Sequence, residues 1–146
     1  MAERDPLIGA RFALDVDGVV SAFFASASGF NNSSEVVTHQ AVDASGKSVI
    51  QKIPGDLTWD DLTLSRGITD DKALWDWRQK VLDGDVVGAR ANGSVIMYNQ
   101  AGEEVSRFNF VNGWPSSWKG PDVSSEDQSV AIEEITIAHE GLERVL

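Results

Sequence analysis

The alternation of apolar and polar positions along the chain predicts a protein built mainly of β-strands. Near the N-terminus, Phe12, Leu14 and Val16 alternate with polar or small residues, which is the period-two pattern of a half-buried strand. The next apolar segment carries Phe23 and Phe24 side by side, and we expect their rings on opposite faces of a strand. By the same pattern, strands are expected at 11–16, 19–28, 35–42, 49–53, within 57–68, and at 86–91, 94–100, 105–112 and 130–138.

Turn-forming residues separate these segments. Asp17-Gly18 predicts a hairpin turn, because glycine accepts a positive φ and aspartate tolerates one. Turns or loops are also expected at 29–34, 43–47, 54–56, 92–93, 101–102 and, rich in Trp and Pro, 113–121.

One segment, Asp71 to Leu82, has helical periodicity. Thr69 or Asp70 is placed to cap it, and Gly84 to end it in a left-handed conformation. The apolar positions form two adjacent faces, one with Leu74, Trp77 and Val81 and one with Trp75, Arg78 and Leu82. The two tryptophans therefore cannot both point into one narrow core, and we expect one in the core and one near a neighbouring subunit or the Trp114–Trp118 segment.

The last predicted strand breaks phase at Glu133-Glu134, and we interpret the break as a β-bulge. Many strands joined by hairpin turns around one helix predict a mainly β fold, a small β-barrel or sandwich with one α-helix. With 146 residues the chain is expected to form a single domain.

The charge and the residue types present exclude several classes of function. With a net charge of −11 the chain lacks the cationic surface that a sequence-independent nucleic-acid binder needs. It has no cysteine, which excludes disulfides, thiolate nucleophiles and Cys-based zinc sites. We expect neither a signal peptide nor a membrane anchor, because the N-terminus lacks a basic and then apolar segment and no apolar run is long enough.

No catalytic, cofactor-binding or metal-binding residues are identified. His139-Glu140 begins like a zinc-protease helix, but Glu143 stands where the second histidine is required, and His39 is the other histidine of the chain. Adjacent carboxylates point to opposite faces of a strand, so they do not form a glycosidase pair by themselves; such pairs occur at 60–61, 70–71, 103–104 and 133–134. We therefore expect no enzymatic activity. The rival interpretation is a monomeric β-sandwich carbohydrate-binding module that stacks sugars on Trp114 and Trp118.

Six sequence blocks, in order, resemble the tail tube proteins of contractile-tailed phages and of phage-tail-like contractile injection systems. The blocks begin with D-P-L-I-G-A-R-F at 5–12 and F-F-A-S-A-S-G at 23–29, and continue with K-I-P-G at 52–55 and L-T-L-S-R-G-I-T at 62–69. L-W-D-W at 74–77 follows, and W-P-S-S-W-K-G-P at 114–121 leads to A-I-E-E and H-E-G-L at 131–134 and 139–142.

This resemblance implies one tail-tube domain over 1–146 with an N-terminal arm at 1–10, related in fold to the haemolysin-coregulated protein of type VI secretion. It implies homohexameric rings stacked into a tube, a contractile sheath around the tube, baseplate and terminator proteins at its ends, and effector protein or DNA as cargo in the lumen. Assembly is expected in the cytoplasm, in a phage tail or a particle that can be released from the cell. The acidic balance is consistent with a lumen wall that repels DNA phosphates.

The arm and the loops around Gly46 and Gly55 are expected to carry the contacts between rings. They are polar, rich in turn residues and have no evident role in a core. On this hypothesis, deletion of Ala2 to Leu7 leaves folded rings that fail to stack.

Overall fold

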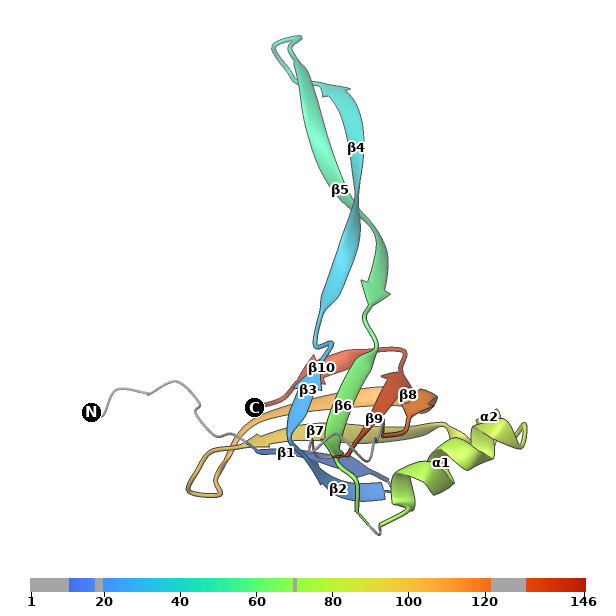
Figure 1. The fold of residues 1–146 in the computed structure, drawn as a ribbon. Coiled ribbons are helices and arrows are strands. Elements are labelled where there is room, and N and C mark those ends of the chain that lie inside the picture. The colour runs from blue at the N-terminus through green and yellow to red at the C-terminus, as the bar shows by residue number, and fades with distance from the viewer. Residues whose placement is uncertain (1–10, 18–19, 70, 122–130) are drawn as a thin grey trace. The chain divides into compact units, whose positions relative to one another are not determined.

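The computed structural model describes residues 11–17, 20–69, 71–121 and 131–146 (Figure 1). The chain divides into two compact units. We call Asn31–Asp60 the hairpin unit and the remainder, Met1–Phe30 with Asp61–Leu146, the barrel unit. Within the described residues, no helix has the length and apolar character needed to cross a membrane.

The barrel unit contains an eight-stranded antiparallel sheet over the residues that the structure describes. Seven strands follow the order β2-β1-β7-β8-β9-β6-β3, and β10 pairs with β8 beside this path. Their bounds are β1 Arg11–Val16, β2 Val20–Phe24, β3 Ser26–Ser28, β6 Leu62–Gly67, β7 Ala91–Tyr98, β8 Glu104–Lys119, β9 Ile132–Ala138 and β10 Leu142–Arg144.

The sheet curls back on itself at two corners. The strands at the two ends of the path, β2 and β3, are consecutive in the chain and are separated by Ala25, whose N–H donates to the Ser65 carbonyl of β6 at 3.0 Å. The long strand β8 pairs with β7 and β10 through its first half and with β9 through its second half. We call β2, β1, β7, the first half of β8 and β10 sheet A, and the second half of β8 with β9, β6 and β3 sheet B. The predicted mainly β barrel or sandwich is confirmed.

The core lies between the two sheets, and the predicted strand phases account for much of it. Leu14 and Val16 of β1 and Leu62 and Leu64 of β6 have at most 1% of their surface exposed. Phe24 is buried whereas Phe23, the next residue, is 58% exposed, so the adjacent rings do occupy opposite faces.

Two helices, rather than the predicted one, pack on this core. The first, α1 (Ala73–Leu82), begins two residues later than expected, and Gly84 follows its C-terminus in the predicted left-handed conformation with a φ of 89°. Thr69, one of the two expected caps, does not cap the helix: the N-cap position is Lys72, which makes no side-chain capping hydrogen bond. In the segment before the helix, Thr69 Oγ1 accepts from the Asp71 N–H at 3.1 Å and Asp71 Oδ1 accepts from the Ala73 N–H at 3.0 Å. Asp70, the other expected cap, lies outside the described residues.

The strand expected at 86–91 is wrong. Val86–Ala89 forms a short helix, α2, because the Asp85 carboxylate accepts a hydrogen bond from the Gly88 N–H and caps its first turn. The turn expected at Asn92-Gly93 is also wrong, since both residues lie inside β7. A shift in the β7–β8 register occurs there, and a side chain at Gly93 would meet the Phe110 ring at 2.6 Å. Glycine is therefore required by close packing and not by a turn.

The Trp- and Pro-rich segment predicted as a loop is the second half of β8. Pro115 sits next to a register shift, where a residue without an N–H is tolerated in a sheet. The bulge expected at Glu133-Glu134 is wrong as well, because β9 pairs with β6 without interruption from Ile132 to Ile137. The phase break instead places Glu133 on the core side of β9 together with Ile135 and Ile137.

The hairpin unit consists of two long antiparallel strands, β4 (Asn32–Val42) and β5 (Ser48–Trp59). Both are longer than predicted: residues 32–34 of the expected loop belong to β4, and the turn expected at 54–56 lies inside β5. Gly55 and Asp56 stand opposite Glu35 alone, so the Pro-Gly signal marks a β-bulge.

The tip of the hairpin unit is the turn predicted at 43–47. Asp43 Oδ1 accepts hydrogen bonds from the Ser45 hydroxyl at 2.7 Å and from the Lys47 N–H at 2.9 Å. These bonds, led by that of Ser45, hold the pKa of the Asp43 carboxyl below its usual value.

Gly29 provides a test of the backbone packing in the barrel unit. Its φ is +94°, and a Cβ there would lie 1.9 Å from the Asp61 carbonyl oxygen. Gly102, in the turn between β7 and β8, has a φ of +82° with nothing within 4 Å. Gly102→Ala is expected to lower the free energy of unfolding by about 1–2 kcal/mol through backbone strain alone. Gly29→Ala adds a steric clash and is expected to cost about 2–5 kcal/mol.

Urea unfolding followed by circular dichroism measures both changes. Equal losses in the two variants would contradict the close approach of Gly29 to Asp61.

Candidate assembly surfaces

The candidate carboxylates that the structure describes lie in several different environments. Glu133 is 4% exposed on the core side of β9, and Glu134 is half-buried on the other side. Glu104 accepts hydrogen bonds from the Arg107 guanidinium, at 2.7 Å from Nε, which holds the pKa of its carboxyl below the usual value. Asp60 and Asp61 are exposed, and Asp70 lies outside the described residues.

The two histidines lie in different environments. His39 is exposed in the hairpin unit, and His139 is half-buried in the barrel unit, with its ring centroid 6.4 Å from that of Phe110. No group of three or more His, Cys, Asp or Glu side chains that could hold a metal ion occurs in the described part of the chain.

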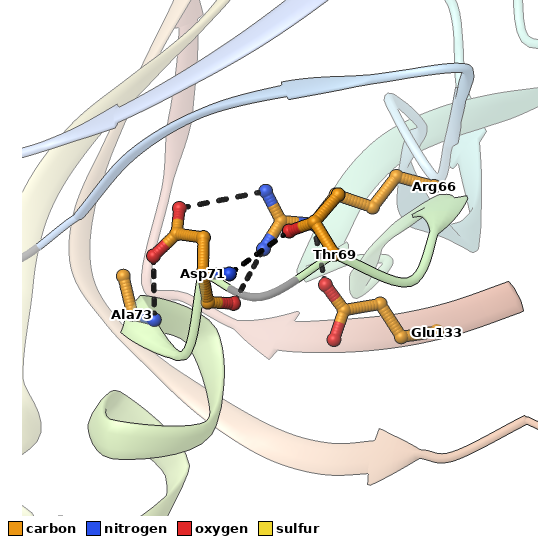
Figure 2. A network of polar contacts seen from close by, with 5 residues as sticks. All are labelled: Arg66, Thr69, Asp71, Ala73 and Glu133. Atoms are coloured by element: carbon orange, nitrogen blue, oxygen red, sulfur yellow. Dashed lines mark hydrogen bonds and ion pairs between the residues drawn. The ribbon is translucent and has the colours of Figure 1, made fainter.

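A buried ion pair is the main polar feature of the barrel interior (Figure 2). Arg66 of β6 stands directly opposite Glu133 of β9, and its Nε donates to Glu133 Oε1. The two residues are 8% and 4% exposed. The sequence carries a signal for this pair, because each charge is in phase with the buried leucines or isoleucines of its own strand.

The same guanidinium reaches the start of helix α1. Arg66 lies 3.8 Å from Asp71 Oδ2 through Nη1, and its Nη2 donates to the Asp71 carbonyl at 3.4 Å. The Phe24 ring lies 5.6 Å from the guanidinium carbon. Arg66 therefore joins β6, β9 and the segment that precedes α1. Because desolvation offsets the attraction in a buried ion pair, we assign the network a positioning role and not a net gain in stability.

The two tryptophans of α1 divide as predicted. Trp77 is fully buried, and its Nε1 donates to the Ala89 carbonyl of α2 at 2.7 Å. Trp75 is 39% exposed and meets Trp118 of β8 edge to face, with ring centroids 5.0 Å apart. Trp114 and Trp118 both pack against the core cluster, which removes them as the free stacking platform of the carbohydrate-binding interpretation.

Among the described residues, exposed apolar side chains mark two surfaces of the barrel unit. On the helical side, Trp75, Leu82 and Val87 are exposed, Val87 by 81%. On the outer face of sheet A, Phe23 is exposed, its ring centroid lies 6.3 Å from that of Tyr98, and the Arg11 guanidinium lies 5.5 Å from it. Aromatic and Arg side chains are enriched in protein–protein interfaces, so both surfaces are candidates for contacts between subunits.

The hairpin unit exposes apolar side chains on both of its faces. By register, Val37 and Ile53 share one face, and Val36, Ile50 and Val42 share the other. All five are between 45% and 72% exposed. A two-stranded hairpin is at best marginally stable in water, so this unit requires cover from outside itself.

The Arg66–Glu133 pair can be tested by removing one charge. Glu133→Gln leaves the Arg66 guanidinium buried without its buried anionic partner and is expected to lower the free energy of unfolding by about 3–5 kcal/mol. Glu134→Gln is the matched control on the opposite side of the same strand, with an expected change within about 0.5 kcal/mol. Chemical unfolding measures both, and a Glu133→Gln variant as stable as its control would contradict the network.

The division between Trp75 and Trp77 predicts two different defects. Trp77→Ala leaves a cavity in the core and is expected to cost about 3–5 kcal/mol of subunit stability. Trp75→Ala removes a half-exposed ring and its contact with Trp118, an aromatic pair that contributes about 0.5–1.5 kcal/mol in addition to the burial of its apolar area. The variant is expected to remain folded and to show weaker self-association. Circular dichroism paired with sedimentation velocity separates the effects; identical unfolding without an association defect in Trp75→Ala would contradict this division.

Solved structures of contractile injection systems contain similar chains. One, from the sheath–tube complex of the PVC extracellular contractile injection system in the extended state, has a TM-score of 0.70 and 23% identity and covers 95% of this chain and 90% of its own. Another, from the tube-terminating cap of the anti-feeding prophage, has a TM-score of 0.70 and 24% identity and covers 99% of this chain and 93% of its own. Hcp1 from Flavobacterium johnsoniae has a TM-score of 0.55 and 16% identity and covers 92% of this chain and 94% of its own.

At these identities the likeness shows the fold, which is the predicted tail-tube and haemolysin-coregulated protein fold. A comparison with curated proteins finds no match. Neither the family comparison nor the solved structures support the carbohydrate-binding alternative. The family described as T4-like virus tail tube protein gp19 matches residues 9–143. The chain belongs to this tail tube protein family.

Proposed function

We propose that this chain is the structural subunit of the inner tube of a contractile injection system or contractile phage tail. Its homohexameric rings stack into a tube whose lumen conducts cargo. The observation that carries the proposal is the match of the tail tube family over residues 9–143, nearly the whole chain. The fold likeness to chains of a sheath–tube complex and of a tube-terminating cap supports it.

In this role residues 1–146 act as one tail-tube domain, and 1–10 act as an arm. The partners are further copies of the chain, a contractile sheath protein, baseplate and terminator proteins, and an effector protein or DNA in the lumen. Assembly takes place in the cytoplasm, and the particle can then leave the cell. The subunit performs no chemistry and needs no cofactor, metal or catalytic residue.

Exposed apolar surface explains why the subunit would assemble. The hairpin unit cannot cover its valines and isoleucines by itself, and the barrel unit exposes Phe23 and Trp75. Burying apolar surface against further copies stabilises the assembly by about 25 cal/mol for each Å² removed from water. Closed rings of identical subunits also pair strand edges that would otherwise aggregate.

The contacts between rings are assigned to the hairpin unit and the arm. The hairpin carries both turn regions named from the sequence, although Gly55 lies at a bulge and only Gly46 lies at the tip, where its φ is +84°. The arm lies outside the described residues.

The proposal predicts rings of uniform diameter or tubes in negative-stain electron microscopy of the purified protein, with matching large species in sedimentation. Ile50 is 67% exposed, so Ile50→Asp is expected to leave the subunit folded and the tubes short or absent. Gln51→Glu adds a charge at the next position of β5 without removing an apolar contact and serves as the matched control. Deletion of Ala2 to Leu7 is expected to give rings that do not stack.

A strictly monomeric species at high concentration, in both methods, would overturn the proposed function. Long tubes formed by the arm deletion or by Ile50→Asp would leave the function standing but would contradict the assignment of the contacts between rings.

A further inference from the structure

Sheet B presents an outer face made almost entirely of small hydroxyl side chains. Its register aligns Ser26, Ser65, Glu134 and Lys119 in one row across four strands. The next row consists of Ser28, Thr63, Thr136 and Ser117. We call the hydroxyl side chains of these two rows the hydroxyl face; they are Ser26, Ser28, Thr63, Ser65, Ser117 and Thr136.

The intervening row shows that these hydroxyls point away from the core. Leu64 and Ile135 lie between the two rows and are fully buried. Because successive side chains of a strand point to opposite faces, the residues on either side of them face outward. Ser26, Ser28 and Ser117 are exposed and the other three are half-buried.

This face differs from the other uncovered surfaces of the barrel unit. The helical side exposes Trp75, Leu82 and Val87, and the outer face of sheet A exposes Phe23 beside Arg11. Among the exposed large apolar residues, the four strands of sheet B contribute Ile132, at the start of β9. A partner that covered the hydroxyl face would gain little from apolar burial and would have to desolvate six hydroxyl groups.

The charge of the face also differs from that of the chain. Its two rows contain one acidic and one basic residue, Glu134 and Lys119, and so carry no net charge. The whole chain has a net charge of −11. The acidic excess is therefore carried elsewhere, and the face exerts little net field on a passing polyanion or polycation.

We propose that the hydroxyl face lines the lumen of the tube, an inference that rests on the proposed function. A conduit wall must stay wet, must not dock further copies of the chain and must not hold cargo of either charge. Of the three surfaces described above, the hydroxyl face meets these conditions, whereas the two surfaces with exposed aromatic residues are suited to contacts between proteins. Uncharged hydroxyl groups thus replace the acidic lining that net charge alone suggested.

The absence of cysteine from the chain makes the proposal directly testable. Ser65→Cys and Thr136→Cys each place one thiol on the hydroxyl face, on different strands, so that one variant remains if the other fails to assemble. Ser94→Cys is the matched control, a half-buried serine on the outer face of sheet A. Each variant is assembled into tubes, inspected by electron microscopy, and treated with a small maleimide or with a maleimide attached to a carrier too wide to enter a tube.

In assembled tubes the thiol introduced at position 65 or 136 is expected to react with the small maleimide and to lose its reactivity toward the wide one. In dissociated subunits it is expected to react with both. The control thiol in tubes is expected to show no such difference between the two reagents.

Two results would overturn the lining assignment while leaving the tube intact. Reaction with the wide maleimide in tubes as fast as in subunits would place the face on the outside. Protection from both reagents would make it a contact between copies. If the unmodified chain forms neither rings nor tubes, the proposed function fails, and the assignment of the lining fails with it.

Discussion

The barrel unit depends on the double pairing of strand β8. One strand of sixteen residues, Glu104–Lys119, supplies hydrogen bonds to β7 and β10 with its first half and to β9 with its second. The change of partner occurs around Asn112, which has a φ of 50°, a conformation that asparagine tolerates better than most residues. The Asn112 N–H donates to Asn92 Oδ1 of β7 at 3.1 Å, so the bend is held by a side chain of the neighbouring strand. Without this bend, sheets A and B would be one open sheet with nothing to enclose.

Contacts made by the helices and by the buried charges hold the helices against the sheets that β8 joins. Trp77 is buried in the core, and its Nε1 donates a hydrogen bond to α2. The Arg78 guanidinium donates to the Pro115 carbonyl of β8 at 2.9 Å. Arg66 fixes the start of α1 against β6 and β9 through Asp71 and Glu133. A guanidinium offers several donors in a planar fork, which suits a residue that must join three segments at once. The position of Trp75 on the surface thus follows from polar contacts made inside the barrel.

Membership of the tail tube family is consistent with a chain that forms a packed core but leaves many apolar side chains exposed on its surface. The hairpin unit carries apolar side chains on two faces that its own strands cannot cover, and the barrel unit exposes aromatic residues on two of its surfaces. These features are liabilities in a monomer, and in the proposed closed, stacked assembly they become contacts between copies. The hydroxyl face of sheet B is the exception, and its neutrality and small side chains suit a surface that stays in water.

The sequence by itself determined the fold class, the family and those local elements for which a short residue pattern is compatible with one structure alone. The period-two alternation of β1, the helical faces that separate Trp75 from Trp77 and the left-handed Gly84 belong to this group. Each depends on residues near one another in the chain. The six ordered blocks identified the family for a related reason, because each block is a local pattern of residues.

Tertiary structure decided the features that depend on distant residues. Asn92-Gly93 and Pro54-Gly55 have the composition of turns, yet both lie at shifts in strand register, because a partner strand supplies hydrogen bonds that composition does not reveal. The Trp- and Pro-rich segment became a strand for the same reason. The break in phase at Glu133-Glu134 predicts a bulge, yet the structure buries Glu133 in a regular strand. A lone carboxylate is costly to bury, and Arg66, 67 positions away in the chain, makes its burial possible. Local patterns specify which segments form strands, but the pairing between distant strands specifies which side chains can be buried.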